Sequence, residues 1–422
     1  MMNFTKLKGW VNNQIAVNNR LKAVCIWYLI FLMMTARKHS LTAAASFSGL
    51  QTSQFSRFLS NNWRVAVYQL DQLSKRQARQ FSAAIESLAA GQLPWRIAIL
   101  IDSTIQHRWS LHSDNVQRFN HGKGFVIGHQ WTNIVLLIND KLIPLPPIPF
   151  HSKSYCRKHK IEYKTENTLV IEYIENLNLV DYIGGHDPKH VVVLADSGYD
   201  DRKIENAILK KRWHFIIALN KNRGVKSENS YLSTPKSKGC SQVAQFFNDH
   251  RCVGWQTIRI FKIQNRSKKK RMEFRIRQIK GYLRYVGYVL LICSQFKKRP
   301  GGRLKYLACS DLKASARQII IGYRMRWAIE IFHKEVKMFL GFEDVATKYF
   351  DSVIAHVHWV YCAYILLNAG PFDTRVGGIA GKQQRISEII SNGERSRVIQ
   401  MLTQFNGAQR YKTELQQAMA DT

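Results

Sequence analysis

The stretch ARQIIIGYRMRWAIEIFHKEVKMFL covers residues 316–340 and has the apolar periodicity of an α-helix. It contains no proline, and no cluster of turn-forming residues follows Gly322. At about 100° per residue, one side of this helix carries an apolar row that we expect to face the core. The row consists of Met325, Ile329, Phe332, Val336 and Phe339. The stretch therefore predicts one long helix that packs on a folded core.

The opposite side of this helix carries one acid among basic and phenolic side chains. Tyr323, Arg326, Glu330 and Lys337 fall within about 60° of arc when the residues are placed on a helix. A solvated helix face could carry the same residues, although such a face more often spreads mixed charges widely. A single carboxylate flanked at turn spacing by Arg and Lys suits a metal-bound acid with phosphate-binding neighbours. Periodicity alone leaves both interpretations open.

The spacing of these four residues resembles the signature of an enzyme family. It is similar to the Y-(2)-R-(3)-E-(6)-K pattern of bacterial DDE transposases of insertion-sequence family 4, which are cut-and-paste enzymes. The surrounding string R-W-x-I-E-x-F-H-K also resembles this family. The resemblance implies that Glu330 is the last acid of a DDE triad. It also implies that Tyr323, Arg326, Lys334 and Lys337 bind DNA.

Two aspartates follow short apolar segments that we expect to be buried strands. Residues 96–101 end at Asp102, and residues 191–195 end at Asp196. An aspartate after a strand is by itself more often a turn former. The order of strands and helices nevertheless fits a ribonuclease-H-like plan, in which the first and fourth strands are neighbours. Asp102 and Asp196 are then expected to meet at adjacent strand ends, and their settings, D-S-T and D-S-G-Y-D, also resemble the family.

The resemblance implies that Asp102, Asp196 and Glu330 bind two Mg²⁺ ions, for which Mn²⁺ can substitute. Carboxylate oxygens suit these hard cations. Five other acids are expected to be structural, as helix caps, turns or solvated groups: Asp140, Asp187, Asp200, Asp201 and Glu335. A di-iron site would need a second copy of the Glu330-x-x-His333 spacing, and none is present. The sequence also lacks a P-loop and a serine nucleophile elbow.

Composition indicates a polyanionic partner. The 422 residues contain 63 Lys and Arg against 29 Asp and Glu, which gives a net charge of +34 at an ordinary hydrophobic content of 45%. DNA is the preferred partner, and a ribosome-associated or merely soluble basic protein is the alternative. The seven cysteines are scattered without a CxxC, which predicts reduced thiols in a cytosolic protein. The resemblance implies a place in the bacterial cytoplasm, near the nucleoid. Residues 23–34 are apolar but too short for the roughly 20 residues of a membrane span, so we expect no membrane association.

The first 92 residues are expected to form a helical DNA-binding domain. Within it, residues 41–60 resemble a helix-turn-helix, with Ser40 and Thr52 as caps and Gly49 at the turn. Gln54 and Arg57 would then face outward and read DNA. A plain helical hairpin with a polar face would give the same pattern.

The distance from Asp196 to Glu330 leaves room for an insertion. Residues 221–312 read as a basic, β-rich insertion, in which residues 261–306 carry fifteen Lys and Arg against one acid. A DNA surface explains this excess better than solvated loops do. Trp255 could stack on a base, as an insertion tryptophan does in related transposases, although a core tryptophan fits the sequence better. Lys123, Lys221 and Arg223 are further phosphate-binding candidates in loops beside the expected strands.

These observations predict an α/β protein whose ribonuclease-H-like mixed sheet is flanked by helices and interrupted by the β-rich insertion. The catalytic core would comprise residues 93–220 and 313–370, and a helical tail would follow at 371–422. The resemblance implies that the protein binds the terminal inverted repeats of an insertion sequence, cleaves there and joins the freed 3′-OH to target DNA, as a homodimer. A catalytically silent DNA-binding protein and a host endonuclease with the same core are the alternatives.

Overall fold

The structure is a computed structural model that describes residues 2–121, 124–227, 240–250, 253–265, 268–297, 304–372 and 378–404. The chain divides into two compact units, which are described separately. One unit is Ser74–Lys334, and the other combines Met1–Leu73 with Glu335–Thr422. The boundaries between them fall inside helices α5 (Trp63–Ser82) and α12 (Trp327–Phe339). The five-part organisation drawn from the sequence stays a prediction.

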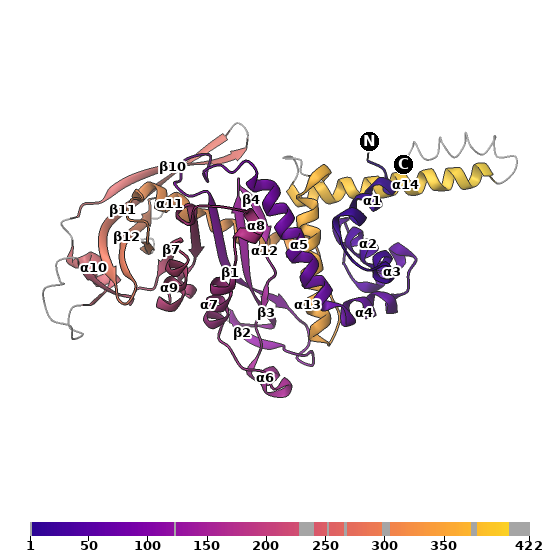
Figure 1. Ribbon diagram of the computed structural model, residues 1–422, viewed down its shortest axis with the longest axis horizontal. Helices are drawn as coiled ribbons and strands as arrows, with labels where there is room; N and C mark the ends of the chain where they lie inside the picture. Colours follow the sequence, from indigo (N-terminus) through magenta and orange to yellow (C-terminus); the bar gives the residue numbers. More distant parts are fainter. Residues whose placement is uncertain are drawn as a thin grey trace. The chain divides into compact units, whose positions relative to one another are not determined.

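The Ser74–Lys334 unit is built on a mixed sheet (Figure 1). Among the described residues, its strands lie in the order β2-β3-β1-β6-β7-β13-β12-β11-β8-β9, while β4 and β5 pair with β3 and β10 pairs with β11. The strands are β1 Ile97–His107, β2 Gln117–His121, β3 Gly124–Ile138, β4 Lys141–Pro144, β5 Ile148–Pro149, β6 Val191–Ala195, β7 His214–Leu219, β8 Gly224–Ser227, β9 Ser241–Gln242, β10 Gln256–Asn265, β11 Lys268–Leu283, β12 Gly287–Phe296 and β13 Lys305–Cys309. This mixed sheet with flanking helices is compatible with the predicted ribonuclease-H-like fold.

Strands β1 and β6 run parallel and side by side, as the sequence predicts. Ile101 pairs with Ala195, so Asp102 and Asp196 come next on neighbouring strands. On its other side β1 pairs antiparallel with β3, which places Asn133 opposite Asp102. The register therefore brings the two aspartates together, and β1 continues past Asp102 to His107 rather than ending there.

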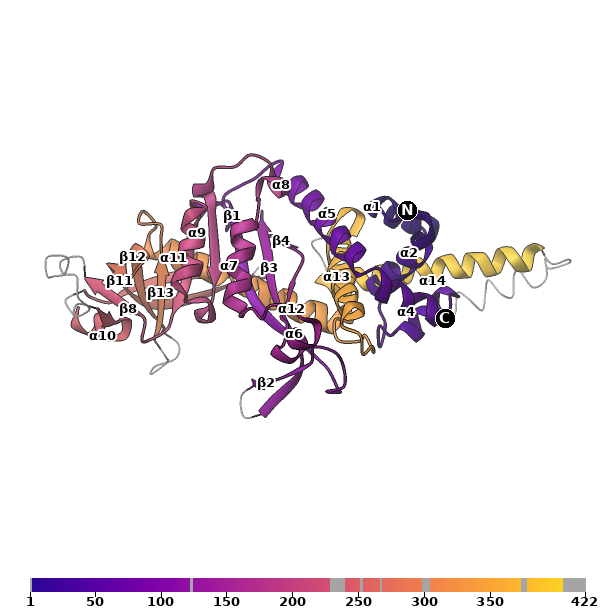
Figure 2. The ribbon, with the colours of Figure 1, turned by 60° about the horizontal axis from the view of Figure 1, so that its bottom comes forward.

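Helices cover both faces of this sheet (Figure 2). The helices of this unit, besides the parts of α5 and α12 that belong to it, are α6 Lys153–His159, α7 Glu166–Asn176, α8 Val180–Ile183, α9 Arg202–Lys210, α10 Val243–Asp249 and α11 Ala316–Met325, with 3₁₀ turns η1 Pro188–His190 and η2 Ser197–Tyr199. On one face, Ile97, Ile99 and Ile101 join a buried apolar cluster with residues of α7, α8 and α9. On the other face, α11 lies so close that a Cβ on Gly322 would be 2.9 Å from Ile216. Because strand residues alternate between faces, Asp102 points to the side of α11 and α12, and Ser103 to the side of α7.

The described part of residues 221–312 contains strands β8 to β13, while its status as an insertion stays a prediction. Its strands do not form a separate sheet, because β13 pairs with β7 and continues the same sheet, with Tyr306 opposite Leu219. Helix α10 and strands β8 and β9 add elements that the sequence did not predict.

The single helix predicted for residues 316–340 is interrupted at Arg326. Helix α11 ends at Met325 and α12 begins at Trp327. The backbone N–H of Arg326 binds the carbonyl of Tyr323 at 3.2 Å, and that of Ile329 binds the carbonyl of Arg326 at 3.1 Å. These i→i−3 bonds tighten one turn, a change that the apolar periodicity does not record. The apolar row itself is confirmed at its centre, since Ile329, Phe332 and Val336 are fully buried.

The second unit is helical in its described residues. It contains α1 Phe4–Gln14, α2 Asn19–Met33, α3 Leu41–Ser48, α4 Thr52–Asn61, α13 Phe350–Leu367, α14 Gly378–Gln404 and the 3₁₀ turn η4 Gly370–Phe372, together with its parts of α5 and α12. Helix α5 starts at Trp63 and ends at Ser82. Helix α13 is long and apolar enough to pass for a membrane span by composition, yet nearly all of it is buried within the protein. This burial is typical of a core helix.

The α3–α4 pair has the local geometry of the predicted helical hairpin. The Ser40 hydroxyl accepts from the N–H of Ala43, and Gly49 has a φ of +73°. The second helix is capped one residue before Thr52, where the Gln54 side chain accepts from the N–H of Gln51 at 2.9 Å. DNA reading by Gln54 and Arg57 stays a prediction, and Gln54 already serves as part of a cap.

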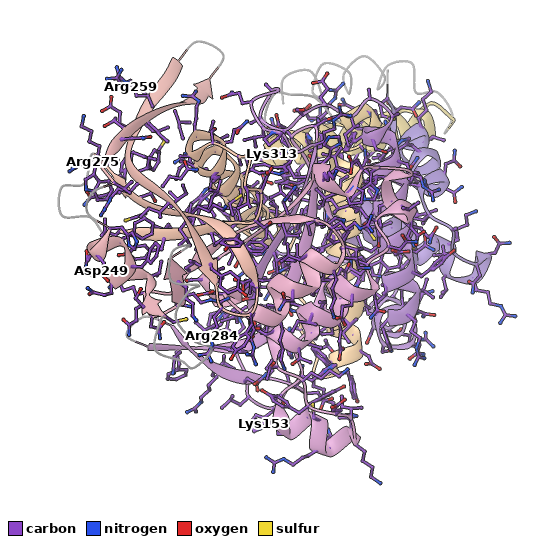
Figure 3. The ribbon with its side chains drawn as sticks, turned by 60° about the vertical axis from the view of Figure 1, so that its left-hand side comes forward. Lys153, Asp249, Arg259, Arg275, Arg284 and Lys313 are labelled. Atoms are coloured by element: carbon purple, nitrogen blue, oxygen red, sulfur yellow. The ribbon has the colours of Figure 1, made fainter. Side chains whose placement is uncertain are left out.

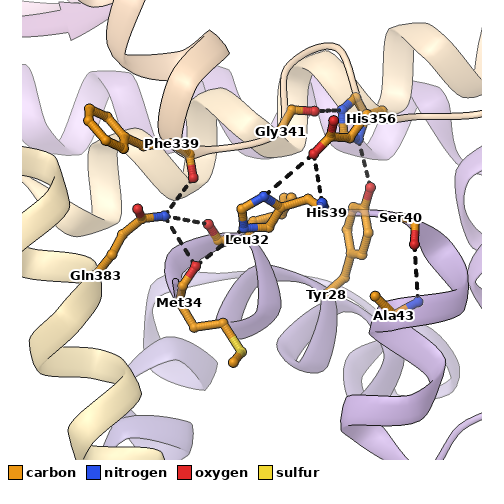
Figure 4. Close-up of polar contacts among 11 residues, drawn as sticks. Tyr28, Leu32, Met34, His39, Ser40, Ala43, Phe339, Gly341, His356 and Gln383 are labelled. Atoms are coloured by element: carbon orange, nitrogen blue, oxygen red, sulfur yellow. Dashed lines mark hydrogen bonds and ion pairs between the residues drawn. The ribbon is translucent and has the colours of Figure 1, made fainter. Parts of the chain in front are cut away.

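A buried polar network joins α2, α13 and the turn after α12 in this unit (Figure 4). His356 Nε2 lies 2.8 Å from the carbonyl of Gly341, so it donates there, and Nδ1 then accepts from the Tyr28 hydroxyl at 2.7 Å. Asp344 Oδ2 accepts from the backbone N–H of His39 at 2.6 Å. Because both ring nitrogens of His356 have buried hydrogen-bond partners, His356 is a structural residue.

Replacing Gly341 by Ala is expected to destabilise this network. Gly341 has a φ of +67°, and an added Cβ would lie 2.4 Å from the Cβ of His39. The backbone penalty and the overlap together predict a loss of about 2–4 kcal/mol in the free energy of unfolding. Urea unfolding would measure it. Gly9→Ala is the control, since nothing lies within 4 Å of its added Cβ and α1 should tolerate or gain from Ala. Equal effects of both changes would contradict the prediction.

Candidate active site

Three predicted acids converge on one side of the central sheet. Asp102 on β1 accepts from Arg326, with Nη1 3.3 Å from Oδ2. The other arm of the same guanidinium, Nη2, forms a short ion pair with Glu330, one turn later on α12. Asp196 follows β6 and accepts from the backbone N–H of Gly198 at 2.8 Å. Arg326 therefore bridges the first and third acids of the predicted triad.

The electrostatics of Asp102 show that the three acids are close enough to influence one another. The pKa of Asp102 is raised to about 6, mainly by burial and also by the charges of Asp196 and Glu330, against the lowering effects of Arg326 and the N–H of Ser103. Burial and two like charges therefore outweigh the opposite charge of Arg326 at this carboxylate.

The carboxylate oxygens of the three acids suit a divalent cation, although Arg326 occupies the space between two of them. Among the described residues, no three acidic, histidine or cysteine side chains are placed so that they could hold a metal ion. Arg326 lies between Asp102 and Glu330, where it takes up the charge of both. The oxygen ligands suit Mg²⁺ or Mn²⁺, and moving the guanidinium would free two carboxylates.

A buried hydrogen bond fixes α12 against the sheet beside these acids. Asn133 lies opposite Asp102 on β3, and its Nδ2 donates to Nε2 of His333 at 3.0 Å. His333 follows Glu330 by three residues, on a neighbouring position of the helix surface. The sequence does not predict this role of Asn133, because an asparagine within an apolar strand can occur for many other reasons.

Tyr323 is the best placed of the predicted DNA-binding residues. Its ring lies 4.7 Å from Nζ of Lys305 and 5.9 Å from the guanidinium carbon of Arg326. Its hydroxyl is buried and has no hydrogen-bond partner among the described residues. A buried, unpartnered hydroxyl beside two cations is suited to an incoming phosphate oxygen. Lys334 is exposed on α12.

For the other predicted DNA contacts, a place beside these acids stays a prediction. Lys337 belongs to the second unit and lies 3.5 Å from Glu343, and Gln54 and Arg57 also belong to that unit. Lys123 lies outside the described residues. Lys221 is exposed after β7.

Arg223 has a structural environment. Its guanidinium lies 3.1 Å from Asp200 and forms a short ion pair with Glu205, and both carboxylates are almost completely buried. Burial raises the pKa of Glu205 to about 7 despite the opposing effect of Arg223. Asp200 is thus a buried partner, and Asp201 caps α9, as the sequence predicts.

Arg223→Ala is expected to lower the free energy of unfolding by about 3–5 kcal/mol, because it leaves two buried carboxylates without a cation. Thermal or urea unfolding would measure this loss. Lys221→Ala removes the same charge from an exposed neighbour and should change stability by less than about 0.5 kcal/mol. Reduced DNA binding by Arg223→Ala at unchanged stability would contradict the structural assignment.

The insertion presents exposed cations around a half-exposed tryptophan. Arg259 and Arg275 lie on β10 and β11, at the outer part of the sheet (Figure 3). Trp255 is 39% exposed, and the guanidinium carbon of Arg275 is 5.1 Å from its ring. The core interpretation of Trp255 was therefore wrong, whereas stacking on a base stays a prediction. Glu273, the acid of this region, is shared by Arg259, Arg271 and Lys297, which leaves positive charge in excess.

Asp102→Asn is expected to stabilise the metal-free protein at high pH. Since the folded-state pKa of about 6 exceeds the ordinary aspartate value of 3.8, ionised Asp102 costs stability above pH 6, and this cost disappears below pH 4. The shift corresponds to at most about 3 kcal/mol. In EDTA, Asp102→Asn should therefore raise the free energy of unfolding by about 1–3 kcal/mol at pH 8, with a smaller gain as pH falls. Asp181→Asn, at an exposed acid, is the control, and a destabilised Asp102→Asn at pH 8 would refute the prediction.

Sequence comparison identifies the family of this core. The model of the transposase DDE domain matches residues 99–366, which is more than half of the chain and includes all three acids. Comparison with proteins of curated function gave no match. Domains of this kind generally use divalent metal ions, which agrees with the oxygen donors of the site. The chain therefore belongs to the family of transposases that carry a DDE domain.

Proposed function

We propose that this protein is a cut-and-paste transposase of insertion-sequence family 4, with Asp102, Asp196 and Glu330 as its catalytic acids. The observation that carries the proposal is that Arg326 bridges Asp102 and Glu330, while the charge of Asp196 acts on Asp102. Tyr323, Arg326, Glu330 and Lys337 have the spacing of the Y-R-E-K signature, and the first three lie together.

The reaction consists of two displacements at phosphorus. In the first, a water oxygen attacks the phosphodiester at the element end; the new P–O bond forms as the bond to the 3′ oxygen breaks, and that oxygen leaves as a 3′-OH. In the second, this 3′-OH attacks a phosphodiester of target DNA, so one such bond forms and one breaks. Two Mg²⁺ ions held by the acids would activate the attacking oxygen and stabilise the leaving one.

The remaining residues bind DNA. Tyr323 supplies its unpartnered hydroxyl to a phosphate oxygen, and Arg326, once it leaves the carboxylates, can bind a phosphate through two N–H groups. Lys334, Lys337, Lys221 and the exposed cations of the insertion add charge along the duplex. We further expect a homodimer on the DNA and a place in the bacterial cytoplasm near the nucleoid.

The test is cleavage of supercoiled plasmid that carries the inverted repeats flanking this gene. Purified protein with Mg²⁺ should cut at the repeat ends and join them to a second plasmid. A protein that binds these ends but cuts in neither Mg²⁺ nor Mn²⁺ would be a silent DNA-binding relative. Cutting without preference for the ends would indicate a host endonuclease.

A further inference from the structure

We propose that Glu166 is a positioning residue that fixes Asp196, through the hydroxyl of Tyr199, in the geometry needed to bind metal. The inference rests on the proposed function, because it assigns a role to Asp196. Glu166 lies outside every motif that the sequence analysis identified, at the first position of α7. It is separated from Asp196 by 30 residues of sequence and joined to its loop by one hydrogen bond.

The loop that carries Asp196 contains a buried aromatic anchor. Asp196 begins the 3₁₀ turn Ser197–Tyr199, and Tyr199 is 4% exposed. The hydroxyl of Tyr199 donates to Oε1 of Glu166 at 2.7 Å. Tyr199 follows Asp196 by three positions, so the position of its hydroxyl limits where the turn can lie.

Two further hydrogen bonds fix the carboxylate of Glu166. Its Oε2 accepts from Nε2 of Gln130 at 2.6 Å, and its Oε1 also accepts from the hydroxyl of Thr132 at 3.2 Å. Gln130 and Thr132 lie on β3, the strand that pairs with β1 beside Asp102. Glu166 thus connects the loop of Asp196 to the strand next to Asp102.

This carboxylate is unsuited to bind the metal itself. Thr132 lies opposite Ser103 in the register, and strand alternation places both on the face opposite to Asp102. Its two oxygens already accept three hydrogen bonds. Its role is therefore to hold and orient the loop, as groups one step removed from a metal commonly do.

A second tie holds the far end of the same loop. Asn220, which follows β7, donates through Nδ2 to the carbonyl of Ser197 at 2.9 Å, and its N–H donates to Asp200 at 2.8 Å. The loop is thus fixed at its start and its end to β7, and at its buried ring to α7. Loss of the buried tie should leave the chain folded but let the Asp196 carboxylate move.

The test compares single-group changes. Tyr199→Phe removes only the hydroxyl, Glu166→Ala removes its acceptor, and Glu166→Gln retains an acceptor of the same size. Ser74→Ala is the matched control, because it removes another buried hydroxyl bond of 2.7 Å, from α5 to the carbonyl of Pro144. Mn²⁺ binding is measured by electron paramagnetic resonance on protein with an element-end duplex, and the Mg²⁺ dependence of cleavage is measured in parallel.

We expect Tyr199→Phe and Glu166→Ala each to raise the half-saturating metal concentration by about tenfold, with the cleavage rate at saturating metal within about threefold of wild type. Glu166→Gln should restore most of the affinity. The double variant should be no worse than Glu166→Ala alone, because that change already removes the acceptor of the Tyr199 hydroxyl. Ser74→Ala should lower the melting temperature without changing metal dependence.

Three results would overturn the inference. One is an unchanged metal dependence in Tyr199→Phe with a melting temperature lowered as in Ser74→Ala, which would mean a purely structural role. Another is a lower rate at saturating metal with unchanged half-saturation. The third is wild-type protein whose Mn²⁺ binding does not respond to Asp196→Ala. If the wild-type protein fails to cleave DNA but the variants change Mn²⁺ binding as expected, the proposed function fails and the positioning role stands.

Discussion

Glu330→Gln is expected to reduce cleavage at the element ends by at least about 10³-fold, since loss of a metal-binding acid removes several kcal/mol of transition-state stabilisation. Binding to the ends should persist, because most of the affinity comes from contacts between cations and phosphates. Gel-shift and plasmid-cleavage assays on one preparation would separate the two effects. The substitution keeps the size of the side chain and an acceptor for Arg326.

The controls for this prediction lie close to the acids that they test. Glu335→Gln changes another acid of α12, and Asp200→Asn changes the acid nearest to Asp196 in the same loop. Glu335→Gln should leave cleavage within about threefold of wild type, since that side chain bonds to Tyr364. Full cleavage by Glu330→Gln with none by Glu335→Gln would show that the third acid was misassigned.

The sequence predicts the proximity of Asp102 and Asp196 from short-range patterns, while their catalytic role stays a prediction. Apolar segments that precede Asp102 and Asp196, and a helix that carries Glu330, can be recognised from the strand and helix periodicities and the expected order of strands. The pairing of Ile101 with Ala195 confirms the neighbouring strands. Once the family pattern gave the order of elements, the acids had to come close together.

The sequence does not predict the contacts that depend on long-range packing. Glu166 looks like any acid at the start of a helix, and its three donors come from β3 and the loop after β6. Arg223 looks like a phosphate-binding loop residue, yet its partners are buried acids that lie 18 and 23 residues away. Similarly, the apolar pattern of residues 316–340 does not reveal the tight turn at Arg326. In each case the fold, and not the local pattern, decides what the side chain meets.

Arg326→Ala is expected to have opposite effects on metal binding and on catalysis. In the DNA-free protein, it removes the guanidinium that bridges Asp102 and Glu330, so Mn²⁺ should bind about tenfold more tightly. Cleavage should nevertheless fall by about 10²-fold or more, because the phosphate contact proposed for Arg326 is lost. Titration with Mn²⁺ without DNA and cleavage with DNA would measure the two effects.

The pH dependence of this variant has a defined sign. Arg326 lowers the pKa of Asp102 in the wild type, so its removal raises that pKa above the present value of about 6. Protons then compete with Mn²⁺ for Asp102 up to a higher pH, so the gain in Mn²⁺ affinity should be largest at pH 8 and should shrink towards pH 6.

Arg326→Lys keeps one charge but cannot bridge two carboxylates with one planar group, so the Mn²⁺ affinity of this variant should fall between those of wild type and Arg326→Ala. Weaker Mn²⁺ binding by Arg326→Ala at pH 8 would mean that the guanidinium organises the acids instead of occupying the space of a cation. In that case Arg326 would have to stay between the two carboxylates when metal binds. A DNA phosphate that binds Arg326 would then not free the carboxylates for metal.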